Sequence, residues 1–383
     1  MEDPSLRAYL HDQICKDWPE YCGEIRLQVM NTPIFNAAMA PNGYVEVFSG
    51  LLLRVRDEDE LAFVLGHEGG HFAENHQIER WQNFKTTANT IFALGLVIGG
   101  VGIYNGVDTS RLIDTVRFVG LAATFSYGRD QETEADRIGF QRATAQGFSP
   151  QAGAALWSRL IAEGKASDFA NIRKADVRAS IFATHPLDAD RLAALKALAG
   201  TKPASGPDPA SAHRLRAAIR PHLAAWLKDD LRRRDFGQTF LIIGNLEALG
   251  EDMGVLNFAR GEVYRLRRLD GDVRLARDAY AAAAQYPDAP ASVWRELGEM
   301  NRRLGEKPAA LVAFRTYLEN HPRRTILGLS RMPLRDLKDP THDTLHPGWP
   351  AGHPVGPRGL RHHRPVAGGS LSRRKVSRLH PWP

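Results

Sequence analysis

Two histidines and a glutamate near residue 70 have the types and the spacing that can hold and use one metal ion. His67 and His71 are four residues apart, so on a helix both imidazoles project from one face. Glu68 follows the first histidine and can act as general base toward a water molecule on the metal. A zinc ion held by three protein groups lowers the pKa of its bound water to roughly 7. The chemistry we expect is metal-assisted hydrolysis of an amide bond.

A solvated helix with two surface histidines is the alternative explanation of this segment. Gly69 and Gly70 argue against it, because each glycine costs a helix roughly 1 kcal/mol relative to alanine. A helix that carries two of them is expected to make room for a group at close range.

A catalytic zinc needs a third protein ligand, and residues 127–140 offer one on a second helix. Glu132 and Asp136 are four residues apart there, so both carboxylates share a helix face. We expect Glu132 to bind the metal and Asp136 to accept the outer N–H of a ligand histidine, which fixes its tautomer. Glu134 points elsewhere by the helical period and is the weaker ligand candidate. An acidic, solvated helix face is the alternative for these carboxylates.

These residues resemble the motifs of a known zinc metallopeptidase family, which includes the CAAX prenyl protease, HtpX and the periplasmic protease BepA. The family pattern, HExxH followed by an ExxAD helix, corresponds to residues 67–71 and 132–136. The chain is most similar to the BepA-like branch, in which tetratricopeptide-like helices follow the peptidase domain, and the resemblance covers about residues 3–322. Further matching positions are Asn36-Ala37, Asn42-Gly43, Gly50-Leu51-Leu52, Thr184-His185-Pro186 and Arg191.

The resemblance implies a cofactor and its ligands. It implies one zinc ion per chain, bound by His67, His71 and Glu132, with His185 able to fill the open metal position and keep the enzyme latent. A structural histidine before Pro186 is the alternative for His185.

The mechanism of peptide hydrolysis suggests roles for further residues. The developing oxyanion needs a donor or the metal itself, and either His185 or Arg191 could be that donor. The strand near Asn36–Ala40 could bind the substrate by adding the peptide backbone to the sheet edge.

Helices and strands must hold these side chains in place. Residues 57–75 predict a helix, with four acidic residues at its positive N-terminal end and an apolar face. Residues 25–30 predict a strand, and the strands expected over 34–40 and 44–48 flank Pro41-Asn42-Gly43, a turn signal for a hairpin. Further helices are expected over 111–147, 152–163 and 187–198.

Residues 86–107 contain no charged side chain and have the length needed to cross a bilayer. Three threonines, five glycines, two asparagines and a tyrosine make the stretch a poor span. We expect a helix and loop in a soluble core, and membrane contact is the alternative.

The length of 383 residues favours two domains and a tail. We expect a mainly α (α+β) fold: a zincin-type metallopeptidase core with a small β-sheet over 1–200, a linker over 201–211 and tetratricopeptide-like helical repeats over 212–322. Residues 323–383 read as a disordered basic tail rich in Pro, His and Arg, which we attribute to a shifted reading frame or an aberrant terminus. The repeat signature consists of Trp294, Leu297, Gly298, Ala310, Phe314, Tyr317 and Pro322, echoed earlier by Gly261, Tyr264, Ala279 and Pro287.

The charge distribution argues against nucleic-acid binding. The net charge is +6, but the last 61 residues carry 12 Lys and Arg against 3 Asp, so the rest of the chain is slightly acidic. A nucleic-acid binder should carry its positive charge on the folded part. We therefore expect no nucleic-acid partner.

Cys15 and Cys22 either pair in an oxidising compartment or are two unrelated thiols. The opening residues lack the basic and apolar regions of a signal peptide, so either the protein is cytoplasmic or a leader is missing from this sequence. The family resemblance favours the periplasm, with peripheral membrane contact.

The expected function is a zinc-dependent endopeptidase that cleaves misfolded or unassembled cell-envelope proteins, with Glu68 as general base. The repeats would recruit envelope assembly partners or restrict access. A latent protease that acts mainly as a chaperone or adaptor is the alternative, and an integral membrane protease is a weaker third.

Overall fold

The computed structural model describes residues 2–78, 129–174, 189–200 and 209–320. Several predictions lie outside these residues and stay predictions. They concern the uncharged stretch 86–107, His185 with its flanking Thr184 and Pro186, Pro322 of the repeat signature and the tail 323–383.

The chain begins with helix α1 (Pro4–Asp17), which Asp3 caps by accepting hydrogen bonds from the backbone N–H groups of Ser5 and Leu6. A short 3-10 helix, η1 (Pro19–Tyr21), follows. Cys15 and Cys22 form a disulfide across this turn. Of the two alternatives that the sequence leaves open for these cysteines, the structure has the pair.

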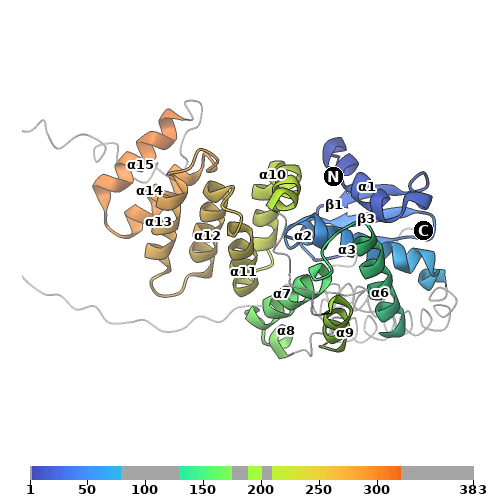
Figure 1. Ribbon diagram of the computed structural model, residues 1–383. Helices are drawn as coiled ribbons and strands as arrows, with labels where there is room; N and C mark the ends of the chain where they lie inside the picture. Colours follow the sequence, from blue (N-terminus) through green and yellow to red (C-terminus); the bar gives the residue numbers. More distant parts are fainter. Residues whose placement is uncertain (1, 79–128, 175–188, 201–208, 321–383) are drawn as a thin grey trace, which may run out of the picture. The chain divides into compact units, whose positions relative to one another are not determined.

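A three-stranded sheet follows, with β1 (Arg26–Met30), β2 (Ala37–Met39) and β3 (Tyr44–Phe48) in the order β1-β3-β2. β2 and β3 are antiparallel, joined through a turn in which Gly43 has a φ of +76°, so the predicted hairpin is confirmed. β1 pairs with β3 in parallel. β2 is thus an edge strand of this sheet, in which β1 and β3 lie side by side (Figure 1).

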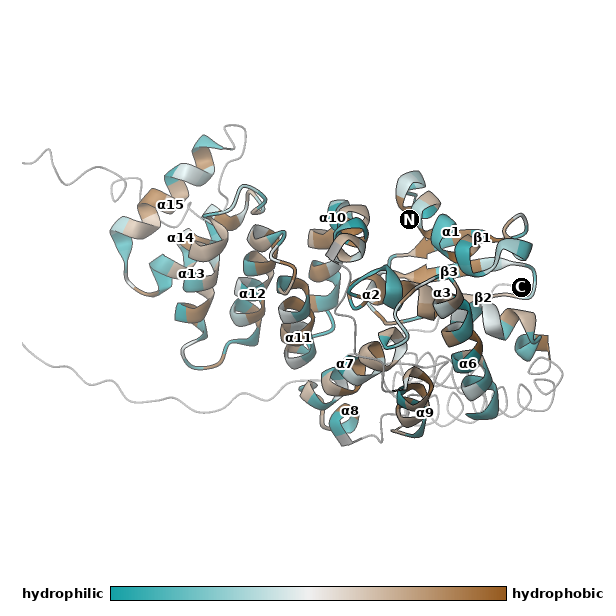
Figure 2. Cartoon of the chain, viewed as in Figure 1, coloured by the Kyte–Doolittle hydropathy of each residue, from teal (hydrophilic) through white to brown (hydrophobic). Residues whose placement is uncertain are grey.

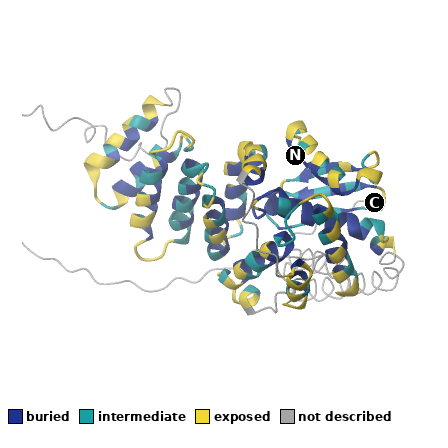
Figure 3. Cartoon of the chain, viewed as in Figure 1, coloured by how far each residue is buried: buried dark blue, intermediate teal, exposed yellow. Residues whose placement is uncertain are grey.

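Helix α2 (Ser49–Leu52) leads to α3 (Glu58–Ala73), the helix that carries the histidine motif. Asp57 caps α3 by accepting from the N–H of Glu60, and the acidic first turn complements the helix dipole. Nearly every residue of α3 is buried (Figure 3), because α1, β2, α6 and α7 all pack against it. The helix is therefore the centre of the core.

The next described helices are α6 (Arg129–Ala145), α7 (Ala152–Ala166), α8 (Ala170–Lys174) and α9 (Ala189–Ala199). α6 runs closely against α3, because Gly66 and Gly139 meet where the two helices cross. A Cβ added at Gly66 would lie 3.1 Å from Cα of Gly139. With glycine at both positions, the two helix backbones approach more closely than they could if side chains lay between them.

Six further helices complete the described chain. Hydrophobic and hydrophilic residues are mixed along them (Figure 2). α12 pairs with α13 and α14 with α15. Both pairs use the same contact: Gly261 packs under the ring of Tyr280, and Gly298 under that of Phe314. The helices are α10 (Pro209–Leu231), α11 (Phe236–Glu247), α12 (Met253–Arg267), α13 (Asp272–Ala283), α14 (Val293–Arg303) and α15 (Lys307–Glu319).

The apolar core does not stop at the expected linker. α10 already begins at Pro209, inside the stretch 201–211, and one continuous cluster of buried side chains runs from Leu6 to Val263. A second cluster runs from Ala276 to Ala313. The helices α10, α11 and α12 thus share the core of the preceding residues.

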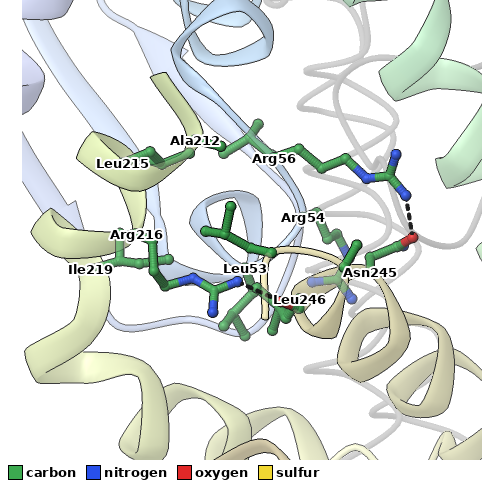
Figure 4. Close-up of a pocket in the computed structure, with 12 residues that line it drawn as sticks. Leu53, Arg54, Arg56, Ala212, Leu215, Arg216, Ile219, Asn245 and Leu246 are labelled. Atoms are coloured by element: carbon green, nitrogen blue, oxygen red, sulfur yellow. Dashed lines mark hydrogen bonds between the residues drawn. The ribbon is translucent and has the colours of Figure 1, made fainter. Parts of the chain in front are cut away.

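A cavity of about 90 Å³ lies between the residues after α2 and the helices α10 and α11 (Figure 4). Its arginines are engaged by protein groups: Arg56 donates to Asn245 and Arg216 to the carbonyl of Leu246. Arg54 donates to Glu163 from α7. The cavity therefore lies at a junction between helices, and neither His67 nor His71 lines it.

The mainly α fold with a small sheet is confirmed. Among the helices of the described ranges, none combines the length and apolar character needed to cross a membrane.

Candidate metal centre

Helix α3 buries all three residues of the motif. His67, Glu68 and His71 have exposed fractions of 2%, 3% and 0%. The two glycines between them face neighbouring elements: a Cβ on Gly69 would overlap the ring of Trp18, and one on Gly70 would lie 3.3 Å from the side chain of Ile138. Close approach explains both glycines, as the sequence predicts, and the solvated-helix alternative does not hold.

Helix α6 brings the glutamate to the two histidines. Nε2 of His67 lies 3.1 Å from Nε2 of His71 and 3.7 Å from Oε2 of Glu132. Nε2 of His71 lies 3.5 Å from Oε1 of Glu132. The three residues thus form a buried group that could hold a metal ion, although 61 positions separate His71 from Glu132 in the sequence.

The donor set and its spacing fit a zinc ion. Zinc binds imidazole nitrogens and carboxylate oxygens at about 2.0–2.2 Å in tetrahedral geometry, which places neighbouring ligand atoms roughly 3.4 Å apart. The three separations above bracket this value. Three protein ligands also leave the fourth tetrahedral position open, as catalytic zinc sites do.

Asp136 orients the first histidine. Its Oδ1 lies 3.0 Å from Nδ1 of His67, so the carboxylate can accept the outer N–H and leave Nε2 free for a metal. Burial alone would raise the pKa of Asp136, but the guanidinium of Arg191 and the hydrogen bond with His67 hold it below its ordinary value. The carboxylate is therefore ionised and a strong acceptor.

Arg191 comes from a third helix, α9, and bridges the two carboxylates. Its Nε and Nη2 donate to Asp136 at 2.8 and 2.7 Å, and its Nη1 lies 2.5 Å from Oε2 of Glu132. The guanidinium is 5.3 Å from the ring centre of Trp157. Sequence reasoning expects Arg191 near the reaction but gives no sign of these carboxylate partners.

The remaining predicted residues lie outside this group. Asn36 is partly buried just before β2, and its carbonyl accepts a hydrogen bond from Phe48. Glu134 faces away from the ligand atoms and approaches His76, with its Oε2 3.3 Å from Nε2 of that histidine. His185 lies outside the described residues.

His76 is a residue that the sequence analysis misses. It is 3% exposed, and its Nδ1 lies 3.0 Å from Nδ1 of His71. The available signal is a third histidine five positions after the second, just beyond the end of α3. Periodicity alone does not bring that position back toward the site.

The sequence of this chain is similar to those of known proteins. The model of the family described as Peptidase family M48 matches residues 8–199. The mitochondrial metalloendopeptidase OMA1 of Schizosaccharomyces pombe is 34% identical over 151 residues, which are 38% of this chain and 41% of that protein. The metalloprotease YcaL of Escherichia coli is 32% identical over 127 residues, 33% of this chain and 47% of its own length.

A putative beta-barrel assembly-enhancing protease of Vibrio cholerae is 29% identical over 160 residues, 41% of this chain and 31% of that protein. The chain thus spans less than half the length of each of these relatives. The family match, however, covers half of the chain and contains all three helices of the site. The resemblance that the motifs indicate is confirmed, and the chain belongs to peptidase family M48.

Proposed function

We propose that this protein is a zinc-dependent endopeptidase. The observation that carries the proposal is the buried convergence of His67, His71 and Glu132. A zinc ion held there would supply a Lewis acid and a water molecule of lowered pKa. Membership of a peptidase family supports the peptide bond as the target.

Glu68 is the proposed general base. It follows the ligand His67 on α3 and is buried with it. Its carboxylate takes a proton from the attacking water and later delivers it to the leaving amine, as general base and then general acid.

Arg191 is proposed to hold the carboxylates of Glu132 and Asp136 in place. Its guanidinium donates two hydrogen bonds to Asp136 and forms an ion pair with Glu132, and bidentate pairing with a carboxylate fixes geometry as well as charge. This contact supports a positioning role more than the oxyanion role expected from the sequence.

The proposed substrate is an extended or unfolded chain that adds a strand to β2. Asn36 and Ala40 hydrogen-bond to β3, so by the alternation of an antiparallel ladder the backbone groups of Ala37 and Met39 face the opposite edge. β2 also packs against α3, which brings this edge to the helix that bears His67. Strand addition reads backbone rather than a fixed sequence.

Misfolded or unassembled envelope proteins are the proposed natural substrates, and the periplasm or a membrane surface facing it is the proposed location. The Cys15–Cys22 disulfide supports an oxidising compartment. The relative named as a putative beta-barrel assembly-enhancing protease supports an envelope role.

Casein cleavage by the purified, zinc-loaded chain tests the proposal. Glu68→Gln should lower the rate at least about 100-fold while zinc content stays at one per chain. His67→Ala should lose both zinc and activity. A zinc-loaded Glu68→Gln variant that cleaves as fast as wild type would overturn the assignment of the base, and a wild type that binds no zinc would overturn the proposal itself.

A latent protease that acts mainly as a chaperone or adaptor is the second candidate. A cavity of about 410 Å³ lined by residues of α10, α12 and α14 favours it, since apolar Leu231 and Phe258 meet charged Lys228 and Arg295 there, a surface suited to a peptide. Suppression of client aggregation by every variant, with cleavage by none, would favour this candidate. Cleavage that rises in His185→Ala would support a latent protease.

A further inference from the structure

The outer nitrogen of the second histidine ligand meets another histidine rather than a carboxylate. Nδ1 of His71 lies 3.0 Å from Nδ1 of His76. Nε2 of His76 lies 3.3 Å from Oε2 of Glu134 on α6. A row of three side chains therefore runs from the candidate metal centre to the surface, where the carboxylate of Glu134 is 44% exposed.

The backbone brings His76 into this row. Asn75, just after α3, has a φ of +56°, a left-handed conformation that asparagine tolerates better than most residues. Its N–H donates to the carbonyl of Phe72, and its own carbonyl accepts from Ile78. The chain reverses at this point and returns His76 to the side of His71 that faces away from the ligand atoms.

The tautomers of the two rings are linked through their shared hydrogen bond. A metal at Nε2 of His71 requires the proton of that ring to be on Nδ1, which then donates to His76. Nδ1 of His76 must accept, so the proton of His76 is on Nε2, where Glu134 can accept it. In the opposite assignment His76 donates to His71, and Nε2 of His71 carries the proton and cannot bind a metal.

We propose that His76 and Glu134 are positioning residues that select the metal-binding tautomer of His71. The carboxylate of Glu134 favours the proton on Nε2 of His76, and this leaves Nδ1 of His76 as the acceptor for His71. His67 is served directly by Asp136 at 3.0 Å. The outer nitrogen of each ligand histidine is therefore linked to a carboxylate of α6. His67 contacts Asp136 directly, and His71 is linked to Glu134 through the ring of His76. This inference rests on the proposed zinc site.

Zinc affinity of the full-length protein, measured by competition with a chromogenic chelator, tests the proposal. Removal of a partner that orients a metal ligand typically costs 10–100-fold in metal affinity, so His76→Leu should weaken zinc binding by about that factor. His76→Asn should retain most of the affinity, because its Oδ1 can accept the same proton. His222→Leu is the matched control, because His222 pairs with Asp3, the N-cap residue of α1. This variant should bind zinc as wild type does.

Cobalt substitution gives a second measurement, because the spectrum of bound Co²⁺ responds to its ligands and not to a loss of packing elsewhere. The visible absorption of the Co²⁺ form should change in His76→Leu and return toward the wild-type spectrum in His76→Asn. If His76→Leu does not fold, the zinc affinity of Glu134→Ala tests the proposal instead. The side chain of Glu134 is half-exposed, so its removal should be tolerated by the fold and should still weaken zinc binding several-fold.

Two outcomes would overturn the inference while leaving the proposed function standing. One is a folded His76→Leu that binds zinc as tightly as wild type, and the other is a Glu134→Ala variant with unchanged affinity. A wild-type protein without zinc affinity would instead refute the proposed function.

Discussion

Arg191 and Asp136 form a buried ion pair through two parallel hydrogen bonds, Nε to Oδ2 at 2.8 Å and Nη2 to Oδ1 at 2.7 Å. The pair joins α9 to α6 behind the candidate metal ligands. Because Asp136 also accepts from His67, the position of α9 is coupled to the orientation of a ligand ring. The positive charge of Arg191 also offsets the repulsion between the carboxylates of Glu132 and Asp136.

Replacement of Arg191 by Met should destabilise the fold strongly. Removing one partner of a buried pair typically costs about 3–5 kcal/mol, because the remaining charge is uncompensated, and here two carboxylates lose their partner. Urea unfolding of the metal-free protein measures the change. Arg232→Met is the matched control: its pair with Asp229 is exposed, and its effect should stay below about 1 kcal/mol. Equal effects of the two substitutions would contradict the buried-pair assignment.

Gly139→Ala should push α6 away from α3. The added Cβ would lie 2.8 Å from the backbone nitrogen of His67 and 2.9 Å from the carbonyl of Phe63, and neither backbone atom can rotate away. We expect lower stability, by a few kcal/mol, together with weaker zinc binding. Gly244→Ala is the control, because nothing lies within 4 Å of a Cβ there, and alanine should stabilise that helix by up to about 1 kcal/mol. Unaltered zinc affinity in Gly139→Ala would show that the helix contact does not set the site geometry.

Asp17 should make the stability fall as the pH rises. Among the described residues neither of its carboxylate oxygens has a hydrogen-bond partner, and burial raises its pKa from 3.8 to about 7. The folded protein keeps this proton up to about pH 7 while the unfolded chain releases it near pH 4. Between these values the contribution of Asp17 to the unfolding free energy therefore drops by roughly 1.4 kcal/mol per pH unit.

The variant Asp17→Asn, which cannot ionise, should lose this part of the pH dependence. Thermal or urea unfolding between pH 4 and pH 8 measures it. Asp12→Asn, on the exposed face of the same helix, is the control and should follow the wild-type curve. Parallel curves for wild type and Asp17→Asn would contradict the prediction.

Gln77→Ala should raise peptidase activity, if the edge of β2 receives the substrate. The side-chain amide of Gln77 donates to the carbonyl of Met39, a backbone group that an added strand would use. Without this competitor, kcat/KM for an unfolded substrate should rise a few-fold, mainly through KM. Gln141→Ala on the surface of α6 serves as the control, and an unchanged KM in Gln77→Ala would argue against strand addition at this edge.

Local signals in the sequence predict a large part of this architecture. The turn residues 41–43 predict the hairpin, and the acidic cluster 57–60 predicts the start of α3. The i and i+4 spacing of His67 and His71 predicts a shared face, because these features depend only on residues a few positions apart. The same holds for Glu132 and Asp136.

Features that depend on contacts between distant residues are not predictable in this way. Arg191 meets Glu132 and Asp136 only because α9 packs on α6. His76 returns to His71 because of one left-handed residue, Asn75. The continuation of the core into α10 similarly depends on contacts with α1, α2 and α3, which hydrophobic periodicity within a single helix does not specify.

The meeting of Gly66 and Gly139 has a consequence for how such sites can be found in other sequences. Since backbone contact between two helices sets the distance from the histidines to the glutamate, the number of residues that connect the helices is free to vary. A search that fixes the interval between HEGGH and ETEAD would discard proteins with the same arrangement. A pattern that requires a small residue one position before the first histidine and another seven after the glutamate would retain them.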